Sequence, residues 1–281
     1  MNTRTPPHSP AGPAGPANGA RAALPLAIDP VPAFQDNYIW LLAAGSRAVV
    51  VDPGDAAPVL AALDRRGLAL DAILITHHHP DHVGGVEALV AASGASRVRV
   101  IGPARENIPC ITERVAGGER VTLLGHDFDV IDVPGHTLGH VAYYGAALEA
   151  VFCGDTLFCG GCGRLFEGTP QQMFDSLARL AALPGSTRVY CAHEYTLSNL
   201  RFAQRVEPDS AALTARLEAC VAARGRSEPT VPSTIDAERA TNPFLRCREP
   251  AVRSAAASRT PGADADAVAT FAALRAWKNV A

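Results

Sequence analysis

The chain has 281 residues and a mass of 29.3 kDa, a length that accommodates about two domains of ordinary size. Hydrophobic residues make up 48% of it, which excludes wholesale disorder, yet no apolar run approaches the roughly 18 residues that a membrane-spanning helix needs. The formal net charge is −3, without the basic excess that is typical of nucleic-acid-binding proteins. We therefore expect neither a membrane nor a nucleic acid as a partner.

Seven cysteines are scattered along the chain, and their number is odd. Because no secretory signal stands at the front, this pattern favours free thiols in a reducing compartment over a disulfide framework. Residues 1–24 are rich in Pro, Ala and Gly and predict a disordered extension. A cleaved organellar presequence is a weaker alternative, because two arginines cannot form a basic amphipathic face. We expect a soluble, cytoplasmic monomer.

Short runs rich in Val and Ile, bounded by Gly, Pro and Asp, recur over the first two thirds of the chain. They predict strands over residues 39–42, 48–51, 72–75, 98–101, 128–133, 141–144, 150–153 and 188–191. Helical spacing predicts helices over residues 56–66, 83–92 and 170–183, and then over 195–206, 210–224 and 264–277, where the strand pattern has stopped. The sequence thus predicts an α/β domain over 25–194 and a helical domain over 195–281.

The densest group of chemistry-bearing residues directly follows the predicted strand 72–75. His77 and His79 are two apart in an extended segment, so their side chains point to the same side. Asp81 and His82 follow a proline that turns the chain, so they can face a neighbouring position. Because neutral imidazole and carboxylate both suit Zn²⁺, Fe or Mn²⁺, this segment predicts a place where two metal ions lie close together.

Three further candidate ligands, His136, Asp155 and His193, each come just after another predicted strand. We expect one sheet edge to gather them with the first four. Together they amount to five histidines and two aspartates, enough for two metal sites if one carboxylate bridges. The alternative is that each histidine is an ordinary surface or hydrogen-bonded residue, as single His motifs usually are. Three repeats of the same residue classes at strand ends make that alternative weak.

The pattern from Thr76 to His82 resembles that of hydrolases with the metallo-β-lactamase fold. Within that superfamily the chain resembles the glyoxalase II, or hydroxyacylglutathione hydrolase, family over residues 28–279. The resemblance includes residues 33–38, 51–54, 154–158, 161–168 and 242–246, and the Gly-Cys-Gly segment at 161–163 and the helical tail narrow it to this family. It implies an αββα sandwich with metals at one edge, followed by a smaller helical domain that covers the substrate.

The resemblance also implies two divalent metal ions, most simply zinc, although iron and manganese accept the same ligands. The expected ligands are His77, His79 and His136 for one ion, Asp81, His82 and His193 for the other, and Asp155 for both. A hydroxide shared by the two ions would attack a thioester carbonyl, with Asp81 as the catalytic residue that orients it. The implied substrate is S-D-lactoylglutathione, or a related S-2-hydroxyacylglutathione, hydrolysed in the second step of methylglyoxal detoxification.

Five residues match positions that contact glutathione in the family. They are Arg164, Phe166, Tyr195, Arg275 and Lys278. Arg275 and Lys278 are three apart, so on a helix they project from one face. A solvated helix face is the alternative, but Lys278 is the only lysine in the chain. Phe166 stands where some relatives have tyrosine, so its contact would be through packing or backbone.

Three other polar residues close to the motif have less specific interpretations. His78 is expected to face solvent or to support the ligands, His140 to make a structural or orienting hydrogen bond, and Asp52 to support a ligand from behind. Cys159 and Cys162 form a C-x-x-C without the second pair that a zinc ribbon requires, so we interpret them as packing residues.

Several rival functions remain at this level. A glutathione persulfide dioxygenase would use a single iron, but Asp81, His82 and His193 are all available for a second metal. Another hydrolase of the same fold would act on a β-lactam, a lactone or a phosphodiester. A non-catalytic glutathione- or metal-binding protein is the third class, and the presence of all seven candidate ligands argues against it.

Overall fold

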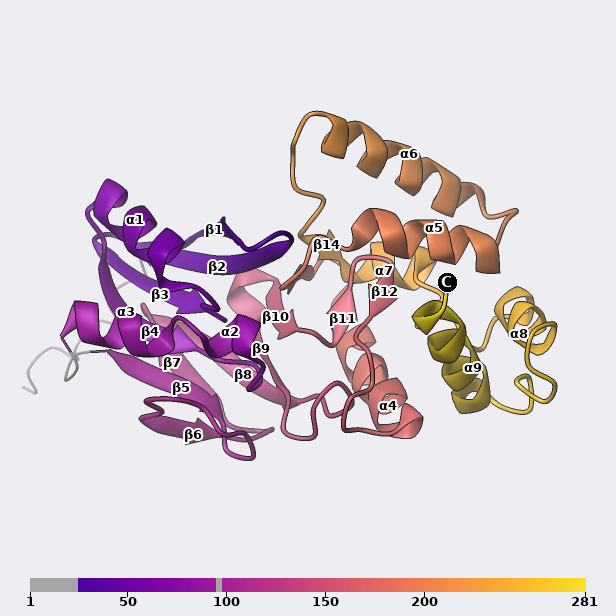
Figure 1. Ribbon diagram of the computed structural model, residues 1–281, viewed down its shortest axis with the longest axis horizontal. Helices are drawn as coiled ribbons and strands as arrows, with labels where there is room; N and C mark the ends of the chain where they lie inside the picture. The colour runs from indigo at the N-terminus through magenta and orange to yellow at the C-terminus, as the bar shows by residue number, and fades with distance from the viewer. Residues whose placement is uncertain (1–24, 95–97) are drawn as a thin grey trace, which may run out of the picture.

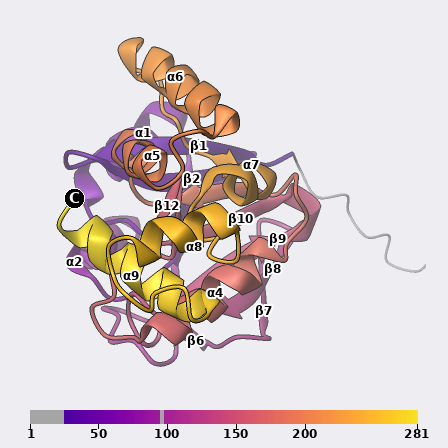
Figure 2. The same cartoon turned by 90° about the vertical axis from the view of Figure 1, so that its right-hand side faces the viewer.

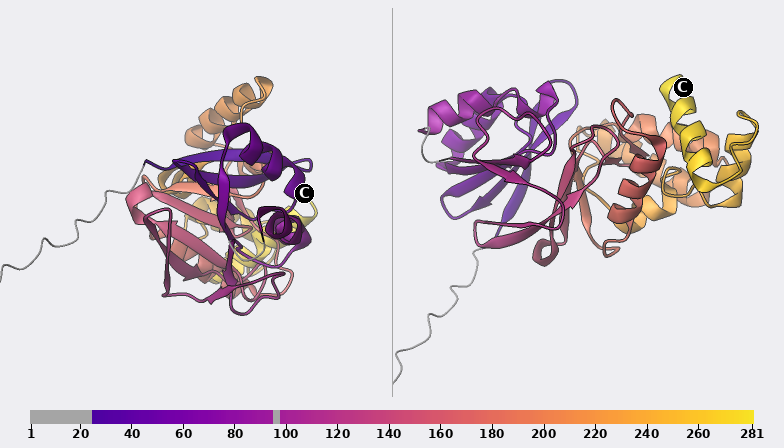
Figure 3. Two further views of the ribbon diagram at one scale, coloured as in Figure 1. Left: turned by 90° about the vertical axis from the view of Figure 1, so that its left-hand side faces the viewer. Right: turned by 90° about the horizontal axis from the view of Figure 1, so that it is seen from below.

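The computed structural model describes residues 25–94 and 98–281, so the predicted extension over residues 1–24 lies outside the described part of the chain. Two six-stranded sheets pack face to face, with helices on their outer faces, and a group of helices follows at one end (Figure 1). The sandwich and the helical part lie side by side in two perpendicular views (Figure 3). This architecture confirms the predicted α/β sandwich with a smaller helical region behind it.

The first sheet follows the order of the chain. Its strands are β1 (Ala27–Ala33), β2 (Asn37–Ala44), β3 (Arg47–Val51), β4 (Ala69–Leu74), β5 (Arg99–Pro103) and β6 (Glu113–Val115). The first three strands are antiparallel to one another and the last four are parallel. Parallel neighbours need crossover connections, and these are supplied by α1 (Ala56–Arg66) between β3 and β4, and by α2 (Pro80–Val83) and α3 (Val86–Ser93) between β4 and β5.

The second sheet has the strand order β14-β13-β10-β9-β8-β7. Its strands are β7 (Arg120–Leu123), β8 (His126–Asp132), β9 (Val141–Gly145), β10 (Ala150–Gly154), β13 (Arg188–Cys191) and β14 (Ser233–Thr234). The 3-10 turn η1 (Ala146–Leu148) joins β9 to β10, and the hairpin of β11 (Leu157–Phe158) and β12 (Gly161–Cys162) precedes α4 (Pro170–Ala181). The expectation that strands stop at Tyr195 is wrong, because β14 pairs with β13. A two-residue strand leaves no periodicity for a sequence pattern to show.

Side-chain alternation along β2 explains the layers. Trp40 belongs to the cluster between the sheets, together with Phe128 of the second sheet. Ile39 belongs to the cluster on the opposite face, where it is grouped with Val59 of α1 and Leu89 of α3. Successive side chains of a strand point to opposite faces. A strand buried on both faces is therefore largely apolar, as the entirely buried β2 is after its first residue, Asn37.

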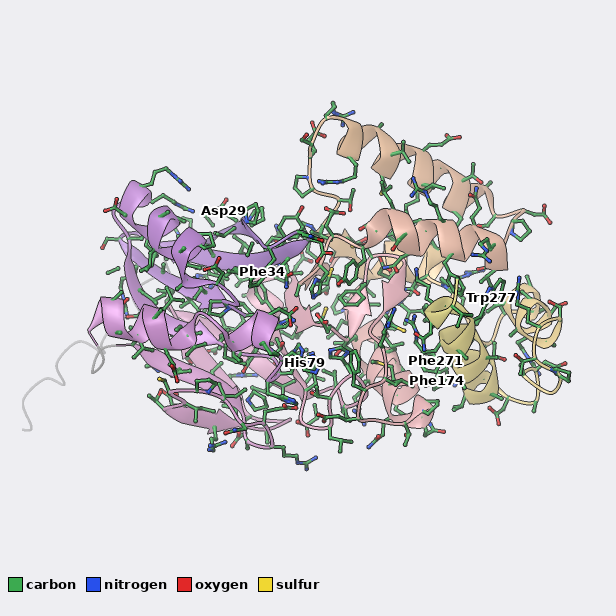
Figure 4. The ribbon with its side chains drawn as sticks, viewed as in Figure 1. Asp29, Phe34, His79, Phe174, Phe271 and Trp277 are labelled. Carbon is green, nitrogen blue, oxygen red and sulfur yellow. The ribbon has the colours of Figure 1, made fainter. Side chains whose placement is uncertain are left out.

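The helical part contains α5 (Thr196–Val206), α6 (Ala211–Gly225), α7 (Ile235–Thr241), α8 (Pro250–Ala257) and α9 (Ala267–Asn279). Helix α9 packs against α4 and α8, whereas α6 lies above α5 and packs against α5 and α7 (Figure 2). The ring centroid of Phe271 in α9 lies 6.2 Å from that of Phe174 in α4 and 5.7 Å from that of Phe244. The helical part therefore shares an aromatic core with the sandwich, and Phe174 and Phe271 lie next to each other in Figure 4. None of the helices in the described part of the chain has the length and apolar character needed to cross a membrane.

The buried carboxylate of Glu238 in α7 ties the helical part to the β11–β12 hairpin. It accepts hydrogen bonds from the Gly160 amide (2.8 Å) and from the Asn242 side chain (2.9 Å), and it forms an ion pair with Arg216. Asn242 in turn donates to the Gly161 carbonyl at 2.9 Å. A buried charge with several hydrogen bonds fixes the geometry of the hairpin, and residues 162–164 leave from its end.

We expect Glu238→Ala to lower the free energy of unfolding by about 3–5 kcal/mol, because it leaves the Arg216 charge buried and uncompensated. Asp236→Ala is the matched control on the same helix, since that carboxylate is exposed and forms an exposed ion pair with Arg239 at 3.3 Å. This substitution should cost about 1 kcal/mol or less. Urea unfolding followed by circular dichroism measures both. Equal losses in the two variants would contradict the role given to Glu238.

Candidate metal centre and adjoining cleft

The seven candidate ligands meet where strands of both sheets end. His77, His79, Asp81 and His82 follow β4 of the first sheet, whereas His136, Asp155 and His193 follow β8, β10 and β13 of the second. The expectation of a single sheet edge is therefore wrong. The site lies at the junction of two edges, on the side of the sandwich that faces the helical part, where Figure 4 labels His79. Strand patterns along a sequence do not reveal how strands divide between sheets.

A local irregularity aims Asp155 into this junction. The pairing of β10 with β13 shifts register between Phe152 and Gly154, as in a β-bulge. Bulges next to active sites often redirect a side chain. Gly154 has φ +46°, and a Cβ there would lie only 2.3 Å from the Thr76 hydroxyl oxygen. Only glycine fits this combination of backbone conformation and close approach.

The ligand atoms form three overlapping groups in which all atoms lie within 4.8 Å of one another. The groups are His77, His79 and His136; His77, His82 and Asp155; and Asp81, His82 and His193. In the first group His79 Nδ1 lies 3.1 Å from His77 Nε2 and 3.0 Å from His136 Nε2. Such convergence of ring nitrogens is the arrangement that a shared cation requires.

The two carboxylate oxygens of Asp155 face different parts of the cluster, one toward His136 and the other toward His82 and His193. Its Oδ2 lies 3.4 Å from His136 Nε2, whereas its Oδ1 lies 3.4 Å from His82 Nε2 and 3.3 Å from His193 Nε2. On the second side, Asp81 Oδ2 lies 3.5 Å from His82 Nε2 and 3.4 Å from His193 Nε2. A carboxylate placed in this way can bind one cation through each oxygen.

The residues present fit a divalent metal. The ring nitrogen Nε2 of His82 and the oxygen Oδ1 of Asp155 are buried without a hydrogen-bond partner among the described residues. Leaving such atoms unsatisfied is costly, and a cation would satisfy both. Burial lowers the pKa of His77 well below its usual value, so its ring is neutral, the form that binds metal. Burial opposes ionisation of Asp155, but His82 and His193 lower its pKa below the usual range.

Polar groups on the outer side of the cluster orient the rings of His77, His82 and His136. Asp52 accepts from the Thr76 amide (2.8 Å) and hydroxyl (2.7 Å), and Thr76 Oγ1 lies 3.1 Å from His77 Nδ1. Asp52 Oδ2 also lies 3.0 Å from His82 Nδ1. His136 Nδ1 donates to the Arg164 carbonyl at 2.8 Å. Partners on the outer ring nitrogen fix the tautomer and leave Nε2 free to bind.

The turn between β1 and β2, with the first residue of β2, holds the side chains of His193 and Asp81 in place. Asp36 Oδ1 lies 3.0 Å from His193 Nδ1, and the Asn37 side chain donates to Asp81 Oδ2 at 3.1 Å. Both residues lie in the segment 33–38, which is part of the family resemblance, but no local pattern indicates what they contact. Their signal was a polar turn between two strands, which does not reveal its partners.

His140 and His78 lie near the cluster without belonging to its ligand groups. His140 Nε2 accepts from the Asp155 amide at 3.2 Å, and its ring stacks on that of His77 with centroids 4.5 Å apart. His78 pairs with the buried carboxylate of Glu106. That carboxylate also accepts from the Thr137 hydroxyl (2.7 Å) and the Gly139 amide (2.9 Å), so it connects the two histidine-bearing loops. No local sequence pattern indicates this role of Glu106.

A cleft of about 540 Å³ adjoins the cluster at His136 and Asp155. All five predicted substrate-binding residues line it, namely Arg164, Phe166, Tyr195, Arg275 and Lys278. The Phe166 ring stands edge-on to His79 and His136, with centroids 5.4 and 5.2 Å away. The Tyr195 ring is parallel to His193 at 4.6 Å. These aromatic rings place the walls of the cleft directly against the candidate ligands.

The two predicted cations of α9 are not on a solvated face. Arg275 is only 5% exposed, and its Nη1 donates to the Cys162 carbonyl at 2.7 Å. Lys278 Nζ donates to the Ser198 carbonyl at 3.2 Å. Burial and the neighbouring Arg275 lower the pKa of Lys278 to about 8. A partly desolvated ammonium group at the cleft is poised to bind an anion.

Comparison with known proteins agrees with this geometry. Residues 34–193 match the family model of the metallo-beta-lactamase superfamily, and residues 194–281 match that of the hydroxyacylglutathione hydrolase C-terminus. The hydroxyacylglutathione hydrolase of Ectopseudomonas mendocina is 56% identical over 257 residues, covering 90% of this chain and 99% of that protein. The corresponding enzyme of Pseudomonas aeruginosa strain LESB58 is 57% identical over 258 residues, with the same shares covered.

Among solved structures, TTHA1623 in a di-iron-bound form is 30% identical, with a TM-score of 0.54 over 78% of this chain and 99% of that one. ETHE1 from Myxococcus xanthus, at 22% identity, shares the fold with a TM-score of 0.62 over 90% of each chain. The superfamily implies divalent metal binding, which matches the His and Asp groups described above. By identity and coverage, the chain belongs to the hydroxyacylglutathione hydrolase family of the metallo-β-lactamase superfamily.

Proposed function

We propose that this protein hydrolyses S-D-lactoylglutathione, and related S-2-hydroxyacylglutathiones, to glutathione and the free 2-hydroxy acid. In a cell this reaction is the second step of methylglyoxal detoxification, and we place it in the cytoplasm, carried out by a monomer. The observation that carries the proposal is the junction of a divalent-metal cluster with a cleft lined by Arg164, Tyr195, Arg275 and Lys278. A thioester that bears a peptide with two carboxylates fits both parts.

We assign two divalent ions to the cluster, with zinc as the first choice and iron or manganese accepting the same ligands. His77, His79 and His136 would hold one ion and Asp81, His82 and His193 the other, with Asp155 shared. When bound, such a pair lowers the pKa of water toward neutrality and stabilises negative charge on an attacked carbonyl. The division of the two Asp155 oxygens between the halves of the cluster supports this assignment.

Asp81 is the catalytic residue of the proposal. Burial opposes its ionisation, but hydrogen bonds from His193 and His82 lower its pKa below the usual range, so it is a carboxylate at neutral pH. Asn37 holds its Oδ2 from the β1–β2 turn. An ionised, oriented acceptor next to the reacting carbon can align an attacking water and take up its proton.

The residues of the cleft would bind the glutathione half. Lys278, Arg164 and the Tyr195 hydroxyl are the groups available to its carboxylates, whereas Arg275 holds the Cys162 carbonyl and so fixes the hairpin end that carries Arg164. The leaving group is a thiol with a pKa near ~8.5, which departs as the thiolate without protonation. The reaction therefore does not depend on a general acid in the cleft.

The decisive experiment is hydrolysis of S-D-lactoylglutathione by the metal-loaded protein, followed by thioester absorbance and by release of free thiol. We expect chelator-sensitive release, and a fall of at least about 100-fold in kcat/KM for His136→Ala and for Asp155→Ala. Asp127→Ala, which removes an exposed carboxylate on β8, is the control and should keep full activity.

Near-normal turnover in either ligand variant at unchanged metal content would refute the proposed chemistry. If the loaded wild-type protein releases no thiol, metal analysis separates the rivals. One iron per chain would favour persulfide oxidation, and no bound metal would favour a binding protein.

The support that Asp52 gives to His82 and Thr76 should be measurable as metal affinity. We expect Asp52→Asn to weaken zinc binding by about 10–100-fold, because the charge that orients the ring and the loop is lost. Asp55→Asn is the control, because asparagine also caps a helix and Asp55 caps α1. Competition with a chromophoric chelator reports the affinity. Equal affinities in the two variants would leave Asp52 without this role.

The lowered pKa of Lys278 predicts how substrate binding changes with pH. Its ammonium is charged below about pH 8 and neutral above it, so KM should rise as the pH passes through that value while kcat changes little. Lys278→Arg keeps the charge throughout this range and should abolish the rise. If KM of the arginine variant rises in the same way, titration of the substrate rather than of Lys278 is the cause.

A further inference from the structure

An exposed aromatic residue outside the cleft also lies beside the candidate metal centre. Phe34 is 60% exposed and lies in the turn between β1 and β2. Phe166, with 64% exposure, is the other strongly exposed aromatic side chain of the described residues, and it already forms a wall of the cationic cleft. Neither the fold nor the proposed glutathione contacts use Phe34.

The turn holds Phe34 in a fixed position. Its φ of +52° lies in the left-handed region that phenylalanine rarely adopts. The same turn is attached to the site at three points. Asp36 accepts from the Glu194 amide at 2.8 Å through its carbonyl and contacts His193 through its carboxylate, and Asn37 binds Asp81. A non-glycine residue in this conformation, held by such contacts, is preorganised.

The contacts around Gly54 show that the Phe34 ring lies close to Asp81. A Cβ on Gly54 would lie 2.9 Å from Phe34 Cε2 and 1.9 Å from the Asp81 carbonyl oxygen. The Phe34 ring and the Asp81 backbone therefore meet over the same glycine. Figure 4 shows Phe34 and His79 on the side of the sandwich that faces the helical part.

Beside Phe34 is a second, more open hollow of about 440 Å³. It is lined by Phe34, Gln35, Asp36, Asn37, Pro80 and Asp81. It shares no lining residue with the cationic cleft, and it reaches the cluster at Asp81, whereas the cleft reaches it at His136 and Asp155. None of its lining residues is basic. The cluster thus lies between a cationic hollow and one with an apolar wall.

The two halves of a thioester leave the carbonyl carbon in different directions, so they need different hollows. We propose that the hollow beside Phe34 is the acyl subsite, and that the Phe34 ring favours acyl groups with a large apolar substituent on C2, such as phenyl, over the methyl of lactoyl. This inference rests on the proposed function for the identity of the thiol half. The charges support the assignment, because the anionic peptide is attracted to Lys278 and Arg164 and repelled by Asp36.

Binding of two thioethers that cannot be hydrolysed tests the subsite without turnover. S-benzylglutathione places a phenyl ring where C2 of the acyl group and its substituents would lie, and S-methylglutathione does not. By calorimetry with the metal-loaded protein, we expect the benzyl compound to bind about 10-fold more tightly, as burial of a few extra carbons allows. Phe34→Ala should reduce this preference to about threefold or less, and Phe34→Leu should retain most of it.

Two further variants test whether Phe34, rather than another exposed side chain, causes the preference for the benzyl compound. Phe166→Ala should weaken both thioethers by a similar factor, because that ring lies in the cleft for the peptide half. Val221→Ala, an exposed apolar side chain on α6, should change neither affinity. Loss of the benzyl preference in Phe166→Ala but not in Phe34→Ala would overturn the proposal, as would a wild-type protein with no benzyl preference.

Turnover gives an independent result. Phe34→Ala should lower kcat/KM for S-D-mandeloylglutathione about 10-fold more than for S-D-lactoylglutathione. Equal losses for the two substrates would overturn the acyl subsite while leaving the thioesterase function intact. A wild-type protein that hydrolyses neither thioester would refute the proposed function, and the binding ratios would still decide whether Phe34 forms a subsite.

Discussion

Seven polar ligand side chains converge at the junction of the two sheets, and the cost of burying their atoms constrains the structure around them. Ring nitrogens and carboxylate oxygens removed from water need partners, and three of these atoms, both ring nitrogens of His82 and Oδ1 of Asp155, make no hydrogen bond among the described residues. The neighbouring elements satisfy the others from behind. Asp52 reaches from the end of β3, the Asp36–Asn37 turn from between β1 and β2, and the Arg164 carbonyl from beyond the hairpin. The contacts to His136 and His193 engage the outer ring nitrogen and leave Nε2 facing the other candidate ligands, so the surroundings favour cation binding rather than a closed polar network.

The same contacts connect the metal centre to the cleft. His136 donates to the backbone of Arg164, the residue whose side chain lines the cleft, so a shift of the hairpin end would move a candidate metal ligand and a residue of the cleft together. The hairpin itself is held from the helical part by Glu238 and Asn242, and by Arg275 at Cys162. The helical part therefore does more than cover the sandwich, because it fixes the loop on which both functions depend.

The sequence predicted the parts of this arrangement that leave a local pattern. Strands such as β2 and β10 are buried on both faces and read as continuous apolar runs. The strand β1 was missed because two prolines interrupt it, which an edge strand tolerates, and β14 is too short to show any period. All seven candidate ligands were identified because they follow predicted strands. What the sequence could not give was the partition of those strands between two sheets, or the partners of Asp36 and Glu106, since these depend on contacts between distant segments.

The side chains that line the hollows, rather than the candidate metal ligands, determine which substrate is selected. Histidine and aspartate groups of this kind can activate water for many electrophiles, so they do not by themselves select a thioester. Selection falls to side chains that touch the two halves of the substrate. On one side, Lys278 and Arg164 offer charge at the mouth of a cleft built by α9 and the hairpin; on the other, Phe34 offers an apolar ring on a preorganised turn. Because that turn also holds Asp81 and His193, a change in its conformation would alter acyl preference and metal geometry together. A single exposed ring can therefore be varied to change the preferred acyl group only as long as the backbone of the turn keeps its hydrogen bonds to the cluster.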